Sequence, residues 1–153
     1  MLQRTLDQLF VGALRRTLFC ERQLQTMLQA AGLVDDALLR ARITHCFEHS
    51  HQRLEHLRSA FKRSAKLARA KRSQTFAAMQ AGFERASSST EQTAWLELAL
   101  HHLLASYSAV MTWAKALGLA ETARAFKDCH LRTKEDLHKL GCYEQHTIHV
   151  KKS

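Results

Sequence analysis

The sequence predicts an all-α fold, and three observations lead to this prediction. The chain has 153 residues, of which 46% are hydrophobic and 24% charged, a composition typical of a globular domain long enough to bury a core. It contains no proline and only 5 glycines, so most of the turn residues that a many-stranded sheet needs are missing. Apolar residues also recur at helical spacing along most of the chain. We therefore predict one helical domain over residues 1–141, followed by a C-terminal tail over residues 142–153.

The first part of the chain predicts two long helices. Thr5-x-x-Gln8 has the spacing of a capping box, and the apolar stripe that follows it ends at Gly32. Either Asp35 or Asp36 can cap the second helix, whose apolar stripe continues toward Leu67 before a run of basic residues.

The second part predicts a short helix and two more long ones. Residues 73–86 place Phe76, Met79 and Phe83 on one face, enough for three turns of amphipathic helix. Ser88-x-x-Glu91 then has capping-box spacing, and the helical pattern that follows it ends at Gly118. A fourth long helix is expected to run from Leu119 and to stop at Gly141.

The connections decide how these helices pack. Short loops at Gly32 and Gly118 make the helices of each pair antiparallel, whereas the longer connection between the pairs contains the short helix. A parallel coiled coil is the alternative, but the apolar stripes are wider than a two-position seam. The sequence thus predicts an antiparallel four-helix bundle with a crossover helix, which is the ferritin-like topology.

The compartment follows from cysteine usage and from the N-terminus. The cysteines are far apart, with no C-x-x-C pair, which favours free thiols over a zinc ribbon, a redox motif or a disulfide framework: Cys20, Cys46, Cys129 and Cys142. Arg4 and Asp7 interrupt the apolar run that a signal peptide would need, and no run reaches the length of a membrane span. We expect a cytoplasmic protein without a membrane span.

Most of the net charge of +9 comes from one segment. Residues 62–73 contain six basic residues and no acidic one: Lys62, Arg63, Lys66, Arg69, Lys71 and Arg72. A solvated, cationic helix end explains this segment without a partner, because a helix dipole favours positive charge there. The functional alternative is an anion-binding surface for nucleic acid, an acidic protein or anionic lipid, with phosphate-directed contacts that do not depend on base sequence.

Polar residues within the apolar stripes are the candidates for chemistry. Bundles of this topology bind metals through Glu and Glu-x-x-His groups that project inward. Glu21 lies within the stripe of the first helix, and Glu48 and His51 are three residues apart on the second. The fourth helix offers His130 as an inward nitrogen, but we identify no inward carboxylate on the third or fourth helix. These four residues could hold one iron or zinc ion.

The alternative needs no metal. Glu21, Glu48 and His51 could instead form a buried polar cluster satisfied by hydrogen bonds to one another or to an arginine. For His130 we favour a hydrogen-bonded core histidine over a metal ligand. Cys129 is expected to be an inert buried thiol, and no catalytic residue is identified.

Several segments, in order along the chain, carry a resemblance to a known family. These are LFCERQL (18–24), Glu48-x-x-His51 followed by Leu54-Glu55, FAAMQAGFERA (76–86), ASY (105–107) and LGLAETARAFK (117–127). Over residues 5–140 the chain resembles the YciF family of bacterial ferritin-like stress proteins. The resemblance implies a ferritin-like bundle with a carboxylate-bridged dinuclear metal site, often in a homodimer, in which Glu21, Glu48 and His51 match ligands of the first metal.

The chain departs from that family on its third and fourth helices. Leu100-His101-His102-Leu103 stands where relatives carry a Glu-His-x-x-Glu segment, and the acidic cluster of the fourth helix is replaced around Leu131-Arg132-Thr133. The ferroxidase, peroxidase or catalase activity that the family implies is therefore not expected, because oxidative chemistry at a dinuclear site needs two irons. We expect a stress-associated binding or interaction protein, a homodimer to which Trp95 and Trp113 could contribute apolar surface; the alternatives are a mononuclear metal protein and a polyanion or acidic-protein binder.

Overall fold

A computed structural model describes the backbone of residues 2–152 and the side chains of residues 5–141. Helices make up nearly all of this part of the chain, and the described residues contain no strand. In order they are α1 (Leu2–Ala31), α2 (Ala37–Arg63), α3 (Gln74–Arg85), α4 (Ser89–Ala116) and α5 (Ala120–Lys152). The predicted all-α bundle is confirmed.

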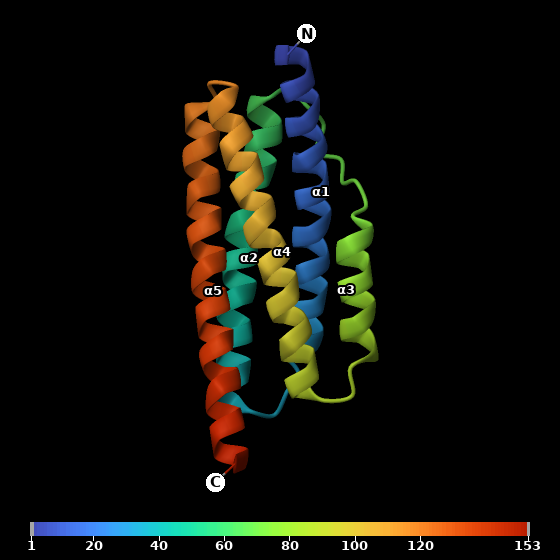
Figure 1. The fold of residues 1–153 in the computed structure, drawn as a ribbon, viewed down its shortest axis with the longest axis vertical. Helices are drawn as coiled ribbons and strands as arrows, with labels where there is room; N and C mark the ends of the chain where they lie inside the picture. The colour runs from blue at the N-terminus through green and yellow to red at the C-terminus, as the bar shows by residue number, and fades with distance from the viewer. Residues whose placement is uncertain (1, 153) are drawn as a thin grey trace.

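The four long helices form a closed ring of antiparallel neighbours (Figure 1). Helix α1 packs on α2 and α4, and α5 packs on the same two helices from the opposite side, whereas the described residues show no α1–α5 packing. Because α2 ends at the opposite end of the bundle from the start of α4, the connection between them must run the length of the molecule. It does so along the outside, and α3 packs there against α1 and α4.

Three predicted helix starts are confirmed by their caps. The Asp36 side chain accepts a hydrogen bond from the backbone N–H of Leu39 at 3.0 Å. Ser73 and Ser88 cap α3 and α4 in the same way, each accepting from the N–H three residues later, at 3.2 and 3.1 Å. Gly118 follows α4 with a φ of 74°, a left-handed conformation that glycine adopts without steric cost.

Three predicted boundaries are wrong. Thr5 lies inside α1, which begins at Leu2. Helix α2 ends at Arg63, since Ala65 takes a left-handed φ of 53° and the chain then runs without regular structure to Ser73. Helix α5 does not stop at Gly141 but continues to Lys152, because a glycine inside a helix costs only about 1 kcal/mol.

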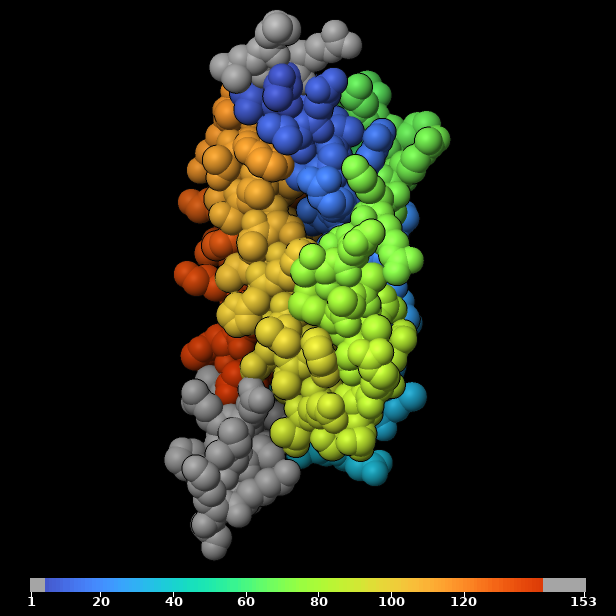
Figure 2. Space-filling view, turned by 45° about the vertical axis from the view of Figure 1, so that its right-hand side comes forward, coloured from blue at the N-terminus to red at the C-terminus, as the bar shows by residue number. Residues whose placement is uncertain are grey.

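The short helix α3 is held against the bundle by Trp95 (Figure 2, where α3 lies over the lower part of the bundle). A Cβ added to Gly82 would lie 2.3 Å from the Trp95 ring, so only glycine lets the two helices approach this closely. Both Trp95 and Trp113 are half-buried and pack on the core of their own chain. Part of the apolar surface of each tryptophan is therefore covered within its own chain, and the dimer contact that we predicted for them stays a prediction.

No helix in the described part of the chain is both long enough and apolar enough to cross a membrane.

Candidate functional site

Glu21 lies at the centre of the bundle and is completely buried. Its two carboxylate oxygens accept four hydrogen bonds from three other side chains. Ser50 donates to Oε2 at 2.7 Å, and Tyr107 donates its hydroxyl to Oε1 at 2.6 Å. Arg53 donates from Nε to Oε1 at 2.7 Å and from Nη2 to Oε2 at 3.3 Å. The carboxylate is thus satisfied by the protein, which a buried charge requires.

Arg53 is the largest fully buried side chain of the described core, and it connects two helices across the bundle. Besides its two bonds to Glu21, it donates from Nη1 to Oδ2 of Asp136 on α5 at 2.9 Å. The other oxygen of Asp136 shares a 2.8 Å hydrogen bond with Nδ1 of His49. We call these six side chains the core network: Glu21, His49, Ser50, Arg53, Tyr107 and Asp136.

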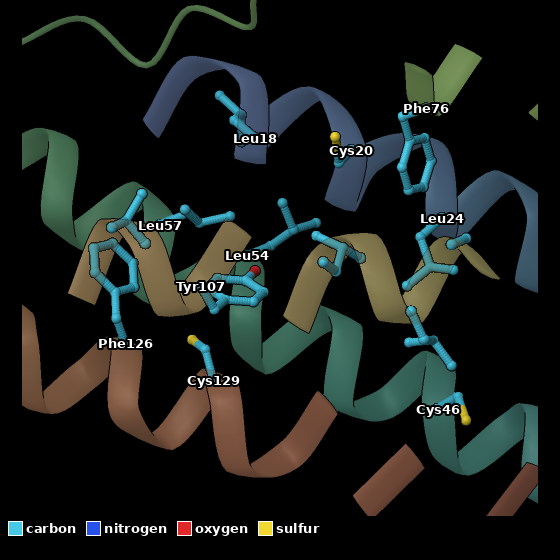
Figure 3. Close-up of a cluster of buried hydrophobic side chains, with 14 of the residues drawn as sticks. Leu18, Cys20, Leu24, Cys46, Leu54, Leu57, Phe76, Tyr107, Phe126 and Cys129 are labelled. Carbon is cyan, nitrogen blue, oxygen red and sulfur yellow. The ribbon is translucent and has the colours of Figure 1, made fainter. Parts of the chain in front are cut away.

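The core network draws on all four long helices. Glu21 comes from α1 and Tyr107 from α4, while α2 supplies Ser50 with Arg53 and α5 supplies Asp136. Figure 3 shows Tyr107 pointing into the bundle from α4, near Leu54 of α2 and Cys129 of α5. Leu18, Leu24, Leu57 and Phe126 are apolar neighbours in the same core, so the core network is enclosed by hydrocarbon.

The buried positions follow the arrangement that ferritin-like metal proteins use for their ligands. In those proteins two helices each contribute one Glu, and the other two each contribute an i, i+3 Glu–His pair. Here α1 contributes Glu21 and α4 contributes Tyr107, whereas the buried i, i+3 pairs are Ser50 with Arg53 and Thr133 with Asp136. A guanidinium thus takes the central place between two carboxylates, and this donor set does not fit a dinuclear metal site.

The predicted ligands are not brought together. Glu48 and His51 lie on the exposed face of α2, where the ring of His51 stacks against Phe47 and contacts Gln25 at 3.4 Å. Glu21, by contrast, is buried with Arg53. His130 is half-buried, while the adjacent Cys129 faces the core. Within the described part of the chain, the metal-ligating side chains that converge in a group of three are His45, His49 and Glu135.

The sequence reasoning missed Asp136. We predicted no inward carboxylate on the last helix, yet Asp136 is completely buried. Two stripes with the same spacing share Phe126, Thr133 and Leu140: one passes through His130 and Leu137, the other through Cys129 and Asp136. The preference for Leu137 over Asp136 as a core residue selected the wrong stripe. Ser50 and Thr133 are polar residues at inward positions of two neighbouring helices. They were the signal in the sequence that indicated a polar cluster in the core.

Burial also determines the protonation chemistry of the core. Burial, with Glu21 nearby, holds the pKa of Tyr107 well above its ordinary value, and burial raises the pKa of the Cys20 thiol to about 12. Burial likewise raises the pKa of the Cys46 and Cys129 thiols. All three are free thiols, as predicted, and they remain protonated and unreactive near neutral pH.

The six basic residues of the predicted anion-binding segment are all exposed. Lys62 and Arg63 end α2, and the other four lie in the irregular connection before α3. The backbone N–H of Lys71 donates to the carbonyl of Arg15 at 3.0 Å, which fastens this connection to α1. The structure therefore presents the positive charges on one continuous stretch of surface chain.

Solved structures with a similar fold include the following three. The E. coli stress protein YciF matches with a TM-score of 0.87 and 17% identity, over 94% of this chain and 97% of that one. A protein from Xanthomonas campestris matches with a TM-score of 0.80 and 17% identity, over 95% and 94%. YcfI from Rhodopseudomonas palustris matches with 0.77 and 18% identity, over 89% and 92%.

Among curated proteins, none matches the sequence. The family model described as a domain of unknown function, DUF892, matches residues 5–148, which is most of the chain. Together with the YciF-like fold, this match identifies the family predicted from the sequence motifs. The chain belongs to the DUF892 family and is a YciF-like helical bundle.

Proposed function

We propose that this chain is a stress-associated binding or interaction protein in which the ferritin-like bundle is kept as a scaffold and the dinuclear oxidation chemistry is lost. One observation carries the proposal: Arg53 is held between Glu21 and Asp136 at the centre of the bundle. A guanidinium cannot be deprotonated in a protein, cannot ligate a metal and has no redox chemistry. The association with stress is supported by the fold shared with E. coli YciF, which is a stress protein.

The electrostatics of the core network support the same conclusion. A metal ion between Glu21 and Asp136 would have to displace Arg53 and leave its charge buried without a partner, which costs several kcal/mol. The ion would also compete with the Ser50 and Tyr107 hydroxyls for the oxygens of Glu21. The network thus favours its own cation over an added one.

An iron oxidation assay tests this proposal. Ferrous iron is added anaerobically to the wild-type protein, oxygen is admitted, and formation of ferric iron is followed by absorbance beside a ferritin and a buffer blank. We expect a rate equal to that of the blank. Oxidation at a ferritin-like rate, with two irons bound per chain, would refute the proposal.

A second candidate function is polyanion binding, favoured by the exposure of all six basic residues of the 62–72 segment. A surface cavity of about 290 Å³ lies beside it, between α1, α4 and the start of α3 (the hollow between these elements in Figure 2). Its lining includes Arg16, Ser73, Thr75 and His102, which offer hydrogen-bond donors next to the positive segment. The phosphate groups of a nucleic acid, or the carboxylates of an acidic protein, fit this combination of charge and donors.

Salt dependence tests the second candidate. The logarithm of the affinity for duplex DNA should fall linearly with the logarithm of salt concentration, and neutralising the six basic residues should remove most of the affinity. A matched control neutralises exposed basic residues of α5, such as Arg124 and Lys127, and should change little. Equal loss in both variants would argue against a specific surface.

The homodimer remains a prediction from the family resemblance. Leucines on the surface of the described chain are the available apolar contacts, including Leu33, which is 85% exposed, and Leu131, which is 54% exposed. Light scattering across a concentration series measures the oligomeric state; a mass of one chain at all concentrations would contradict the prediction.

A further inference from the structure

We propose that His45, His49 and Glu135 form a binding site for a divalent transition-metal ion of the zinc class on the outer face of the α2–α5 pair. This site lies at the edge of the core network, with which it shares His49, and it uses none of the ligands that the sequence motifs predict. One ring nitrogen from each histidine and one carboxylate oxygen of Glu135 all lie within 4.8 Å of one another. Nε2 of His45 and Oε1 of Glu135 are 3.7 Å apart, close to the separation of two ligands on one tetrahedral zinc ion.

The spacing along the helix explains why the two histidines converge. His45 and His49 are four residues apart on α2, so both rings project from the same face, and their centroids are 4.2 Å apart. Glu135 approaches from α5, which packs against α2. Two imidazoles and one carboxylate are a common zinc ligand set, with water in the fourth position.

Nε2 of His45 faces Glu135 at 3.7 Å, which is too far for a hydrogen bond. Nε2 of this ring is shielded from solvent and has no hydrogen-bond partner, although the side chain as a whole is 35% exposed. A buried nitrogen without a partner costs free energy that a metal–ligand bond would recover.

His49 has a carboxylate partner of the kind that metal-bound histidines usually have. Its Nδ1 shares a 2.8 Å hydrogen bond with Asp136, and donation from Nδ1 leaves the lone pair of the neutral ring on Nε2. Carboxylate partners of this kind fix the ring and strengthen it as a ligand. Asp136 is thus both the far end of the core network and the outer support of the proposed site.

Charge balance favours a cation at this place. With the His49 ring neutral, as metal binding requires, the core network holds two carboxylates, Glu21 and Asp136, against one guanidinium, and so has one net negative charge in a buried environment. A divalent ion on His49 would lie one imidazole ring away from Asp136 and would offset that charge. Lys139 is the competitor, since its ammonium is 3.2 Å from Oε1 of Glu135.

Zinc and cobalt titrations of the full chain, after removal of metals with a chelator, test the proposal. Zn²⁺ binding is measured by calorimetry, and Co²⁺ binding by the visible absorption of tetrahedral cobalt. We expect one ion per chain, at least tenfold weaker binding in His45→Ala and in Glu135→Gln, and stronger binding in Lys139→Gln because the competing ammonium is removed.

His51→Ala is the matched control, since His51 is an exposed histidine on the same helix and was a predicted ligand of the alternative site. Its affinity for Zn²⁺ should equal that of the wild type. Absence of saturable binding, or equal loss in His51→Ala and His45→Ala, would overturn the proposal. Far-UV circular dichroism of each variant establishes that it is folded, and the iron oxidation assay above is independent of these outcomes.

Discussion

Replacing Arg53 with methionine should cost a large part of the stability of the bundle. Methionine keeps the unbranched apolar stem of the side chain but is shorter and removes three hydrogen bonds, two to Glu21 and one to Asp136. The hydroxyls of Ser50 and Tyr107 remain on Glu21, yet neither supplies a positive charge. Removing one partner of a fully buried ion pair typically costs about 3–5 kcal/mol, and a small domain has only about 5–15 kcal/mol in total.

The free energy of unfolding from urea titrations at pH 7 measures this loss. We expect Arg53→Met to lose about 3–5 kcal/mol of this free energy, with an unchanged slope against urea concentration. Arg53→Lys should show a smaller but clear loss, because lysine keeps the charge but not the forked geometry of the guanidinium. In a double-mutant cycle, Glu21→Gln should cost less when Arg53 is already methionine, with a coupling of about 1–3 kcal/mol.

Arg58→Met is the matched control for this experiment. Arg58 lies on the same helix and pairs with Glu55 at 2.8 Å, but the two side chains are 53% and 71% exposed. An exposed pair of this kind contributes about 0–1 kcal/mol, so the control should change stability little. A loss in Arg53→Met no larger than that in Arg58→Met, or the absence of coupling with Glu21, would refute the role assigned to the core network.

Three further predictions concern packing and titration. Gly82→Ala should lower the free energy of unfolding by about 1–3 kcal/mol because its Cβ would lie 2.3 Å from the Trp95 ring. Gly12→Ala should raise it by about 0.5–1 kcal/mol, because that Cβ meets only the end of a flexible side chain at 3.6 Å. Urea titrations compare the two variants, and equal effects would contradict the packing argument. The pKa of Tyr107 is raised in the folded state, so the stability that this tyrosine contributes is present below its pKa in the unfolded chain, about 10, and falls as the pH rises above that value. Tyr107→Phe should therefore flatten the decline of the urea midpoint at alkaline pH. A decline identical to that of the wild type would contradict the raised pKa. In a Cys142→Ser background the three remaining thiols should react with Ellman's reagent at pH 8 only on unfolding, and rapid reaction of the native protein would show that they are not buried.

The architecture was predictable because helix periodicity and capping are local. Asp36, Ser73 and Ser88 each carry an oxygen at the position where a helix begins, and Gly118 supplies the conformation that ends one. Boundaries failed where local signals were weak. Gly141 alone does not stop a helix. The residues after Arg63 have a composition that a helix would tolerate, but they are not helical.

The centre of the bundle was predictable only in part. Glu21 was identified as a carboxylate within an apolar stripe, and an arginine was one of the partners considered for it. Arg53 itself could not be identified, because arginine is normally assigned to the surface and its burial depends on carboxylates from two other helices. Asp136 was missed for the same reason: its partners are 83 and 87 residues away in sequence, so no local pattern shows that its charge is compensated.

The central claim is that Arg53, and not a metal ion, lies between the two buried carboxylates. A crystal structure of protein purified from iron- and zinc-supplemented cells, with anomalous data at both absorption edges, tests it most directly. We predict continuous density for the Arg53 guanidinium between Glu21 and Asp136, with no anomalous peak there. An anomalous peak bound to Glu21, with Arg53 turned away, would contradict it.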